Sequence, residues 1–242
     1  MVFTLAIIGG SGLLKSSLTA FRSLSEETVD TAAGRVFLRS GPLRAGVRLV
    51  FVQRHDATPS RAYTQPSDIA YAAIALALKA VGADAVLGTC SVGSLAAATP
   101  VGALLVPDDF YCASDLRRVY ADYRGHFMPA IDARMRAALL AVLRADTALQ
   151  PRDGGVYVNS RGPRFETRAE VRAMAALGDI VGMTAAHECS ACCEVGLPYA
   201  MLCLVSAALL PPPPPPPPPL AAAAAPAPAS FCGGARARAR SS

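Results

Sequence analysis

This chain contains few lysines, and its net charge is small. Of the 23 basic residues only Lys15 and Lys79 are lysines, and part of the formal net charge of +5 comes from three arginines near the C-terminal end. A surplus this small gives no reason to expect a polyanionic partner. We therefore predict no nucleic-acid binding.

The sequence also lacks an apolar run long enough to cross a bilayer. The longest one in its later part, residues 195–210, is shorter than the roughly 20 residues required and contains Gly196 and Pro198. Residues 1–8 have no basic residue before their apolar run, unlike a secretory signal. We predict no membrane association and a cytoplasmic location.

A disulfide framework is missing as well. The seven cysteines are odd in number and irregularly spaced, which favours free thiols in a reducing compartment. Cys189, Cys192 and Cys193 cluster on one expected helix, but no second pair of ligands accompanies them. We therefore expect core packing rather than a metal site.

What the chain does contain is a core-forming share of apolar residues, 52%, arranged in alternating strand and helix patterns. Strands are predicted at residues 2–8, 34–53 (an antiparallel pair), 85–87, 103–106, 155–158, 180–181 and 199–205. Helices are predicted at residues 69–81, with Ser67 as a cap, and at 131–144, 167–177 and 184–195. This alternation predicts an α/β sandwich around a mixed sheet.

The composition changes abruptly at Ala207. Nine consecutive prolines, residues 211–219, are followed by an alanine- and arginine-rich stretch. Prolines cannot donate backbone hydrogen bonds, and the residues after them offer little apolar surface to pack. We predict a folded domain over residues 1–206 and a disordered tail over 207–242. The abrupt change fits a frameshift, a retained intron or a gene-model error, and equally a genuine divergence.

Three segments at expected strand ends carry groups that bind anions. Ser11 lies in a Gly-Gly-Ser-Gly turn, Arg54 and His55 follow the strand ending at residue 53, and Cys90 and Ser91 lie in a Thr-Cys-Ser-Val-Gly-Ser-Leu segment. Backbone amides, hydroxyls and a guanidinium suit an oxyanion such as phosphate. Taken alone, a glycine-rich turn is more often structural, and an arginine–histidine pair is more often a surface charge with a satisfied histidine. Their succession favours an anion site.

Two further motifs complete a recognisable order: Gly-Pro-Arg-Phe-Glu-Thr at residues 162–167, and Gly-Met-Thr at 182–184 with Glu188 downstream. With these, residues 1 to about 205 resemble the purine nucleoside phosphorylase and methylthioadenosine phosphorylase family. The resemblance implies a nucleoside phosphorylase-like α/β sandwich with a central mixed sheet. It also implies phosphorolysis of a purine nucleoside to free purine and pentose 1-phosphate, a homotrimer, and inorganic phosphate as co-substrate without any cofactor.

The resemblance also implies roles for individual residues. The phosphate pocket would be lined by Ser11, Arg54, His55, Cys90, Ser91 and Thr184. Phe165 would pack on the purine or ribose and Met183 would contact the ribose hydroxyls. Glu166 would accept the N1 proton of a 6-oxopurine, which an adenine lacks; the alternative is a surface or capping glutamate. His126 is either a surface histidine or part of a loop that reaches a neighbouring subunit.

The base-protonating segment of the family is what the chain lacks. By the resemblance, an asparagine or aspartate that contacts purine N7 belongs at Ala207, followed by helices that cover the sheet. No Asp follows Asp179 and no Glu follows Glu194. We expect a C-terminally incomplete fold with strongly reduced turnover. Two alternatives are a related nucleoside hydrolase and a degenerate homologue whose proline tract binds an aromatic-lined groove of a partner.

Overall fold

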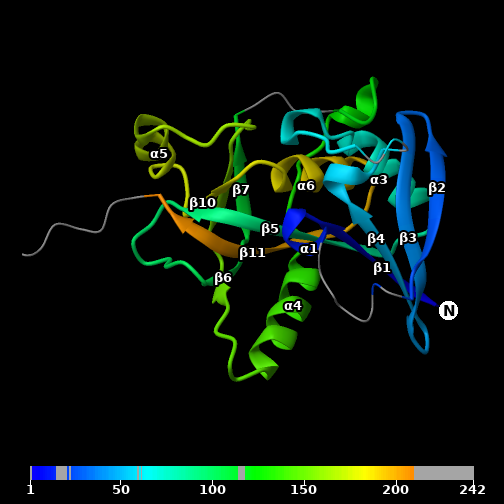
Figure 1. The fold of residues 1–242 in the computed structure, drawn as a ribbon, viewed down its shortest axis with the longest axis horizontal. Coiled ribbons are helices and arrows are strands. Elements are labelled where there is room, and N and C mark those ends of the chain that lie inside the picture. Colours follow the sequence, from blue (N-terminus) through cyan, green and yellow to red (C-terminus); the bar gives the residue numbers. More distant parts are fainter. Residues whose placement is uncertain are drawn as a thin grey trace, which may run out of the picture. The chain divides into compact units, whose positions relative to one another are not determined.

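The computed structural model describes residues 2–14, 21, 23–58, 60, 62–113 and 118–209 (Figure 1). These residues form an α/β fold around one mixed sheet of eleven strands, which confirms the predicted fold class. The proline tract and the predicted tail from residue 210 onward lie outside the described residues, so the division into domain and tail stays a prediction. No helix within the described ranges is long and apolar enough to span a bilayer.

Strand β5 (Ala85–Ser94) is the centre of the sheet because three arms of the sheet branch from it. Its first half pairs in parallel with β1 (Phe3–Gly9), and its last residues pair antiparallel with β10 (Ile180–Gly182). Along its whole length it also pairs in parallel with β11 (Tyr199–Ala208). Strand ends from distant parts of the sequence therefore meet beside the second half of β5.

The remaining strands extend these three arms. One arm continues from β1 through β4 (Val47–Gln53) and β3 (Gly34–Arg44) to β2 (Ser25–Thr31). Beyond β10 lie β9 (Val156–Asn159) and β7 (Asp109–Cys112). Beyond β11 lie β6 (Leu104–Val106) and β8 (Arg152–Asp153).

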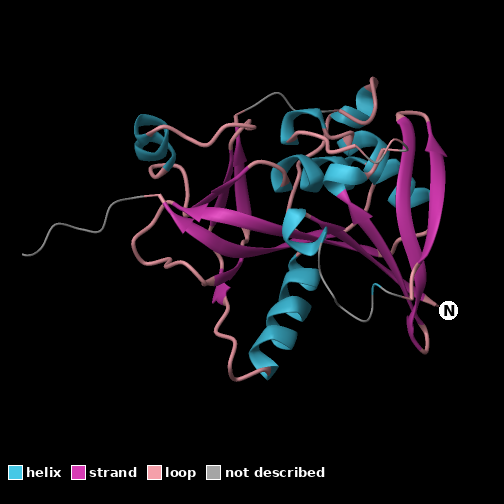
Figure 2. Ribbon diagram, in the orientation of Figure 1, coloured by secondary structure: helices cyan, strands magenta, loops and turns pink. Residues whose placement is uncertain are grey.

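Helices cover both sides of the sheet (Figure 2). Helices α3 (Tyr71–Ala80) and α6 (Ala185–Glu194) lie together on one side, where their small apolar residues belong to the main core. Helix α4 (Ala133–Ala145), whose N-terminus is capped by the Asp132 carboxylate, packs on the other side. Helix α5 (Arg168–Met174) begins with a capping box, and α1 (Ser11–Leu14) is a single turn.

Several local predictions were wrong. The expected Gly-Gly-Ser-Gly turn leads at once into α1, and the expected turn at residues 91–94 continues β5. Ser67 lies in a 3₁₀ turn, Pro66–Asp68, and α3 begins after Ala70 without a side-chain cap. Strands β2 and β7 were not predicted, because β2 is largely polar and exposed and β7 has only four residues.

The end of β11 also differs from the prediction, because the strand continues past residue 206 to Ala208. The next residue, Leu209, packs against a small apolar cluster that contains Leu95 and Val181. Gly93 makes this packing possible, since an added Cβ would lie 2.5 Å from Leu209 Cδ1. A glycine that reads as a turn residue in the sequence is thus a strand residue that makes room for a neighbour.

Candidate active site

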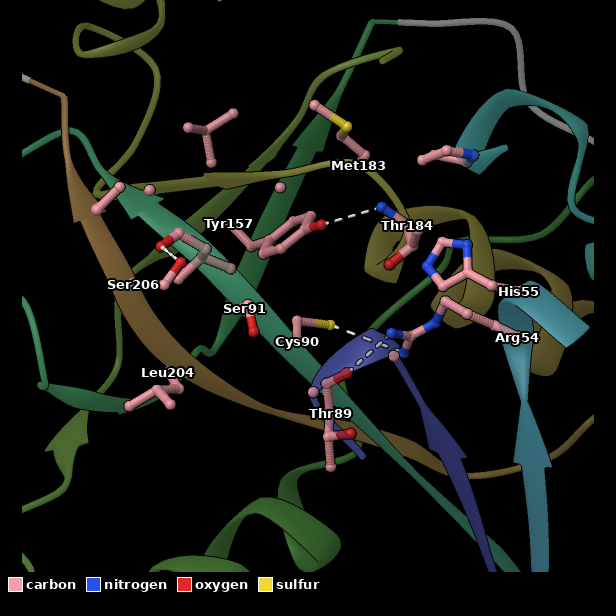
Figure 3. A pocket seen from close by; sticks show the side chains of 18 of the residues that line it. Arg54, His55, Thr89, Cys90, Ser91, Tyr157, Met183, Thr184, Leu204 and Ser206 are labelled. Carbon is pink, nitrogen blue, oxygen red and sulfur yellow. Dashed lines mark hydrogen bonds between the residues drawn. The ribbon is translucent and has the colours of Figure 1, made fainter. Parts of the chain in front are cut away.

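A pocket of about 600 Å³ lies where the second half of β5 meets the ends of β10 and β11 (Figure 3). Nine of the residues singled out in the sequence line it: Arg54, His55, Cys90, Ser91, Phe165, Glu166, Met183, Thr184 and Ala207. Gly10 and Gly12, on either side of Ser11, line it too, whereas the Ser11 side chain lies outside what the structure describes. The structure therefore brings together six segments that are far apart in the sequence.

Arg54 is wholly enclosed at one end of this pocket. Its Nε and Nη2 donate to the two carboxylate oxygens of Glu188, and its Nη1 and Nη2 donate to the carbonyls of Thr89 (2.9 Å) and Ile8 (3.2 Å). Although burial disfavours the charged guanidinium, the Glu188 carboxylate outweighs it, so the pKa of Arg54 is raised. The bidentate partner of Arg54 is thus a carboxylate of the protein itself.

Glu188 was noted in the sequence only as part of a motif, but it organises this end of the pocket. It lies on α6 and also accepts a hydrogen bond of 2.9 Å from the Tyr199 hydroxyl on β11. Gly88 has to be a glycine here, because an added Cβ would overlap that hydroxyl. Gly10 has a similar role, since an added Cβ would lie 2.6 Å from Arg54 Nη1.

His55 follows Arg54 in the short turn after β4. Its Nδ1 lies 2.9 Å from the Thr64 carbonyl oxygen, and its ring stacks on Tyr63 with 5.1 Å between centroids. Burial, reinforced by the Arg54 charge, lowers the pKa of His55. In the neutral ring, the nitrogen that faces a carbonyl carries the proton. Nε2 is then left as an acceptor, suited to a hydroxyl group and not to a bare oxyanion.

Cys90 and Thr184 lie next to Arg54. Cys90 Sγ is 4.0 Å from Arg54 Nη2, and Cys203 is its register partner on β11. A hydrogen bond with Cys203 and the Arg54 charge lower the pKa of the Cys90 thiol. Thr184 is buried immediately before α6, and its backbone amide donates to the Tyr157 hydroxyl (Figure 3).

The opposite end of the pocket is more open. Phe165 is 82% exposed and Glu166 is half-buried on the loop before α5. Arg164 braces this loop through two hydrogen bonds to Glu170, of 2.7 and 2.8 Å, and lowers the pKa of Glu170 to about 2. The brace holds Glu166 at the rim of the pocket.

Met183 lines the pocket and packs closely against Gly162. Gly162 has a φ of +63°, and an added Cβ there would lie 2.6 Å from Met183 Sδ. Only a glycine combines this left-handed backbone with so close an approach. The start of the Gly-Pro-Arg-Phe-Glu-Thr motif is therefore needed to seat the methionine of the Gly-Met-Thr motif.

The end of β11 and the residue after it line the pocket through Ser206, Ala207 and Leu209. The pairing with β5 shifts register between Val205 and Ala207, so that Ser206 is an extra residue and its hydroxyl donates to the Val92 carbonyl at 3.3 Å. Ala207 and Leu209 line the pocket with apolar atoms. A ligand at this end therefore meets a methyl group at Ala207 in place of a polar side chain.

The cysteines of α6 are not arranged around a site. Cys189 and Cys192 are fully buried in the main core, as expected for packing. Within the described ranges, no group of three or more His, Cys, Asp or Glu side chains is placed to hold a metal ion. His187, also on α6, packs against Tyr71 and lies 3.3 Å from the Asn159 amide.

Comparisons with known proteins give a consistent result. The family model described as the phosphorylase superfamily matches residues 4–217. A probable 6-oxopurine nucleoside phosphorylase of Archaeoglobus fulgidus is 33% identical over 199 residues, which cover 82% of this chain and 79% of that protein. A probable S-methyl-5'-thioinosine phosphorylase of Pseudomonas syringae pv. tomato is 35% identical over 217 residues, covering 83% and 82%.

Among solved structures, methylthioadenosine phosphorylase from Schistosoma mansoni is similar in fold. It superposes with a TM-score of 0.72 at 27% identity, over 85% of this chain and 81% of that chain. The similarity in sequence and the similarity in fold therefore point to one family.

Proposed function

This chain belongs to the phosphorylase superfamily, as its motifs predicted, and we propose that its pocket carries out phosphorolysis of a 6-oxopurine nucleoside. Cleavage of purine nucleosides by phosphate is the activity named for the relatives that cover most of this chain. The observation that carries the proposal is the convergence of anion-binding groups and a base-facing glutamate, Glu166, on one pocket.

At the enclosed end, phosphate would lie among Thr184, Ser91, Cys90 and the amides around Ser11. Arg54 supplies a fixed positive charge whose orientation is set by Glu188, and neutral His55 accepts a hydrogen bond from a protonated phosphate oxygen. A phosphate oxygen then attacks the anomeric carbon while the bond to the purine nitrogen breaks. We propose inorganic phosphate as the co-substrate and no cofactor, because no step needs an electron or group carrier.

At the open end, Met183 would contact the ribose hydroxyls and Phe165 would pack on the nucleoside. Glu166 would accept the N1 proton of a 6-oxopurine, which favours inosine and guanosine over an adenine nucleoside. The departing purine carries negative charge, and Ala207 offers it no hydrogen-bond donor. We therefore propose that turnover is lower than a donor at this position would allow. A homotrimer and a cytoplasmic location stay predictions.

The test is an assay of the full chain with inosine, guanosine and methylthioadenosine, each with and without phosphate, following free base by chromatography. We expect slow, phosphate-dependent release from inosine and guanosine. Glu166→Gln should lower kcat/KM for inosine about tenfold relative to that for methylthioadenosine, since a charged acceptor becomes neutral. Release of base without phosphate would instead indicate a hydrolase, and an unchanged ratio would contradict the role of Glu166.

A further inference from the structure

Tyr157 on β9 forms part of the pocket wall, yet it belongs to none of the sequence motifs. Its side chain is fully buried, and its hydroxyl oxygen accepts hydrogen bonds from the backbone amides of both Thr184 and Ala185, each at 3.2 Å. These are the residue before α6 and the first residue of that helix. Tyr157 therefore holds the start of α6, next to the labelled Thr184 (Figure 3).

The neighbouring strand is built to admit this tyrosine. On β10, an added Cβ at Gly182 would lie 2.5 Å from the Tyr157 hydroxyl oxygen. The glycine of the Gly-Met-Thr motif thus leaves room for the phenol of Tyr157 beside the segment that carries Met183 and Thr184. A larger residue at position 182 would push the hydroxyl away from the two amides.

The two hydrogen bonds that the Tyr157 hydroxyl oxygen accepts leave the hydroxyl hydrogen available as a donor. A phenol oxygen has two acceptor sites and one hydrogen, and the amides of Thr184 and Ala185 occupy the acceptor sites. None of the described residues accepts a hydrogen bond from this hydroxyl. Burial raises the pKa of Tyr157 well above its ordinary value, so the hydrogen is retained. A buried hydroxyl normally finds a partner, and Tyr157 is one of the residues that line the pocket.

We propose that Tyr157 is a positioning residue for the anion: its oxygen fixes Thr184 and the start of α6, and its hydroxyl hydrogen points to an acceptor in the occupied pocket. This inference rests on the proposed function, because it takes phosphate to be the ligand beside Thr184. A loosened Thr184 would weaken phosphate binding while leaving the loop that carries Phe165 and Glu166 in place.

Tyr157→Phe tests the inference, and Tyr71→Phe is its matched control. Tyr71 is also buried and donates one hydrogen bond, to the Pro66 carbonyl at 2.9 Å, but it does not line the pocket. For the wild-type chain and both variants, phosphate affinity is measured by calorimetry, and KM is measured for phosphate and for inosine. Unfolding midpoints show how far each variant is destabilised.

We expect Tyr157→Phe to weaken phosphate binding and raise KM for phosphate about tenfold, with KM for inosine changed less than about twofold. Tyr71→Phe should lower the unfolding midpoint without altering phosphate affinity. Equal phosphate affinity in Tyr157→Phe and wild type would overturn the inference and leave the proposed function intact. A wild-type chain that does not bind phosphate would contradict both.

If Tyr157→Phe does not fold, Gly182→Ala displaces the same hydroxyl from the side of β10. The folded Gly182→Ala protein should show a similar loss of phosphate affinity. Wild-type phosphate affinity in that variant would overturn the role of Tyr157.

Discussion

The two ends of the pocket are built differently. At the enclosed end, Arg54, Glu188 and Tyr199 are fully buried and join β4, α6 and β11 through hydrogen bonds between side chains. At the open end, Phe165 is exposed, and the brace between Arg164 and Glu170 lies at the surface. The proposed anion site is thus tied to the core of the fold, whereas the proposed base site lies on a loop and a strand end that can change without disturbing the core.

The largest effect is expected from Glu188→Gln, which removes the buried ion pair at the enclosed end of the pocket. The substitution leaves the buried Arg54 charge without its carboxylate, so we expect a loss of about 3–5 kcal/mol in the free energy of unfolding, measured with urea. The control is Glu170→Gln, whose partner Arg164 is exposed; solvent screens this pair, so the loss should be much smaller. Similar losses in the two variants would show that both ends depend equally on their ion pairs.

Ala207→Asn tests the open end of the pocket by adding a hydrogen-bond donor there. An amide at this position can donate to the departing purine, so we expect kcat for inosine to rise by about 10- to 100-fold. Stability should stay nearly unchanged because Ala207 is exposed. Ala208→Asn is the control, since Ala208 is exposed on the same strand but does not line the pocket. An equal rise in both variants, or none in Ala207→Asn, would count against a missing donor.

The smallest expected effect concerns pH. Burial keeps His55 neutral in the folded protein, with a pKa below its ordinary value. The unfolded chain therefore binds more protons as the pH falls through about 6.5. The stability contributed by His55 should be complete above that pH and should fall on acidification towards the folded-state pKa. Urea unfolding of His55→Asn between pH 7 and 5 should show a smaller decrease than wild type; an identical decrease would assign the effect to other groups.

The same contrast explains what the sequence could predict. The order of the motifs identified the family, and nine of the residues it implied lie on one pocket. The sequence did not reveal that Arg54 is paired with Glu188, because the two residues are 134 positions apart and either could have faced solvent or ligand. Tyr157 has no local signal either, since a tyrosine in an apolar strand is an ordinary core residue. Gly93 was misread because the reason for it, Leu209, is distant in the sequence.

The pairing of Arg54 with Glu188 also affects the order in which parts of the chain fold during synthesis. A chain that has emerged only as far as α5 already contains Arg54 at the end of β4, but neither α6 nor β11. In such a fragment the guanidinium has no counter-ion, and burying it would cost several kcal/mol. We therefore expect the first half of the sheet to enclose Arg54 only after residues 188 and 199 have left the ribosome.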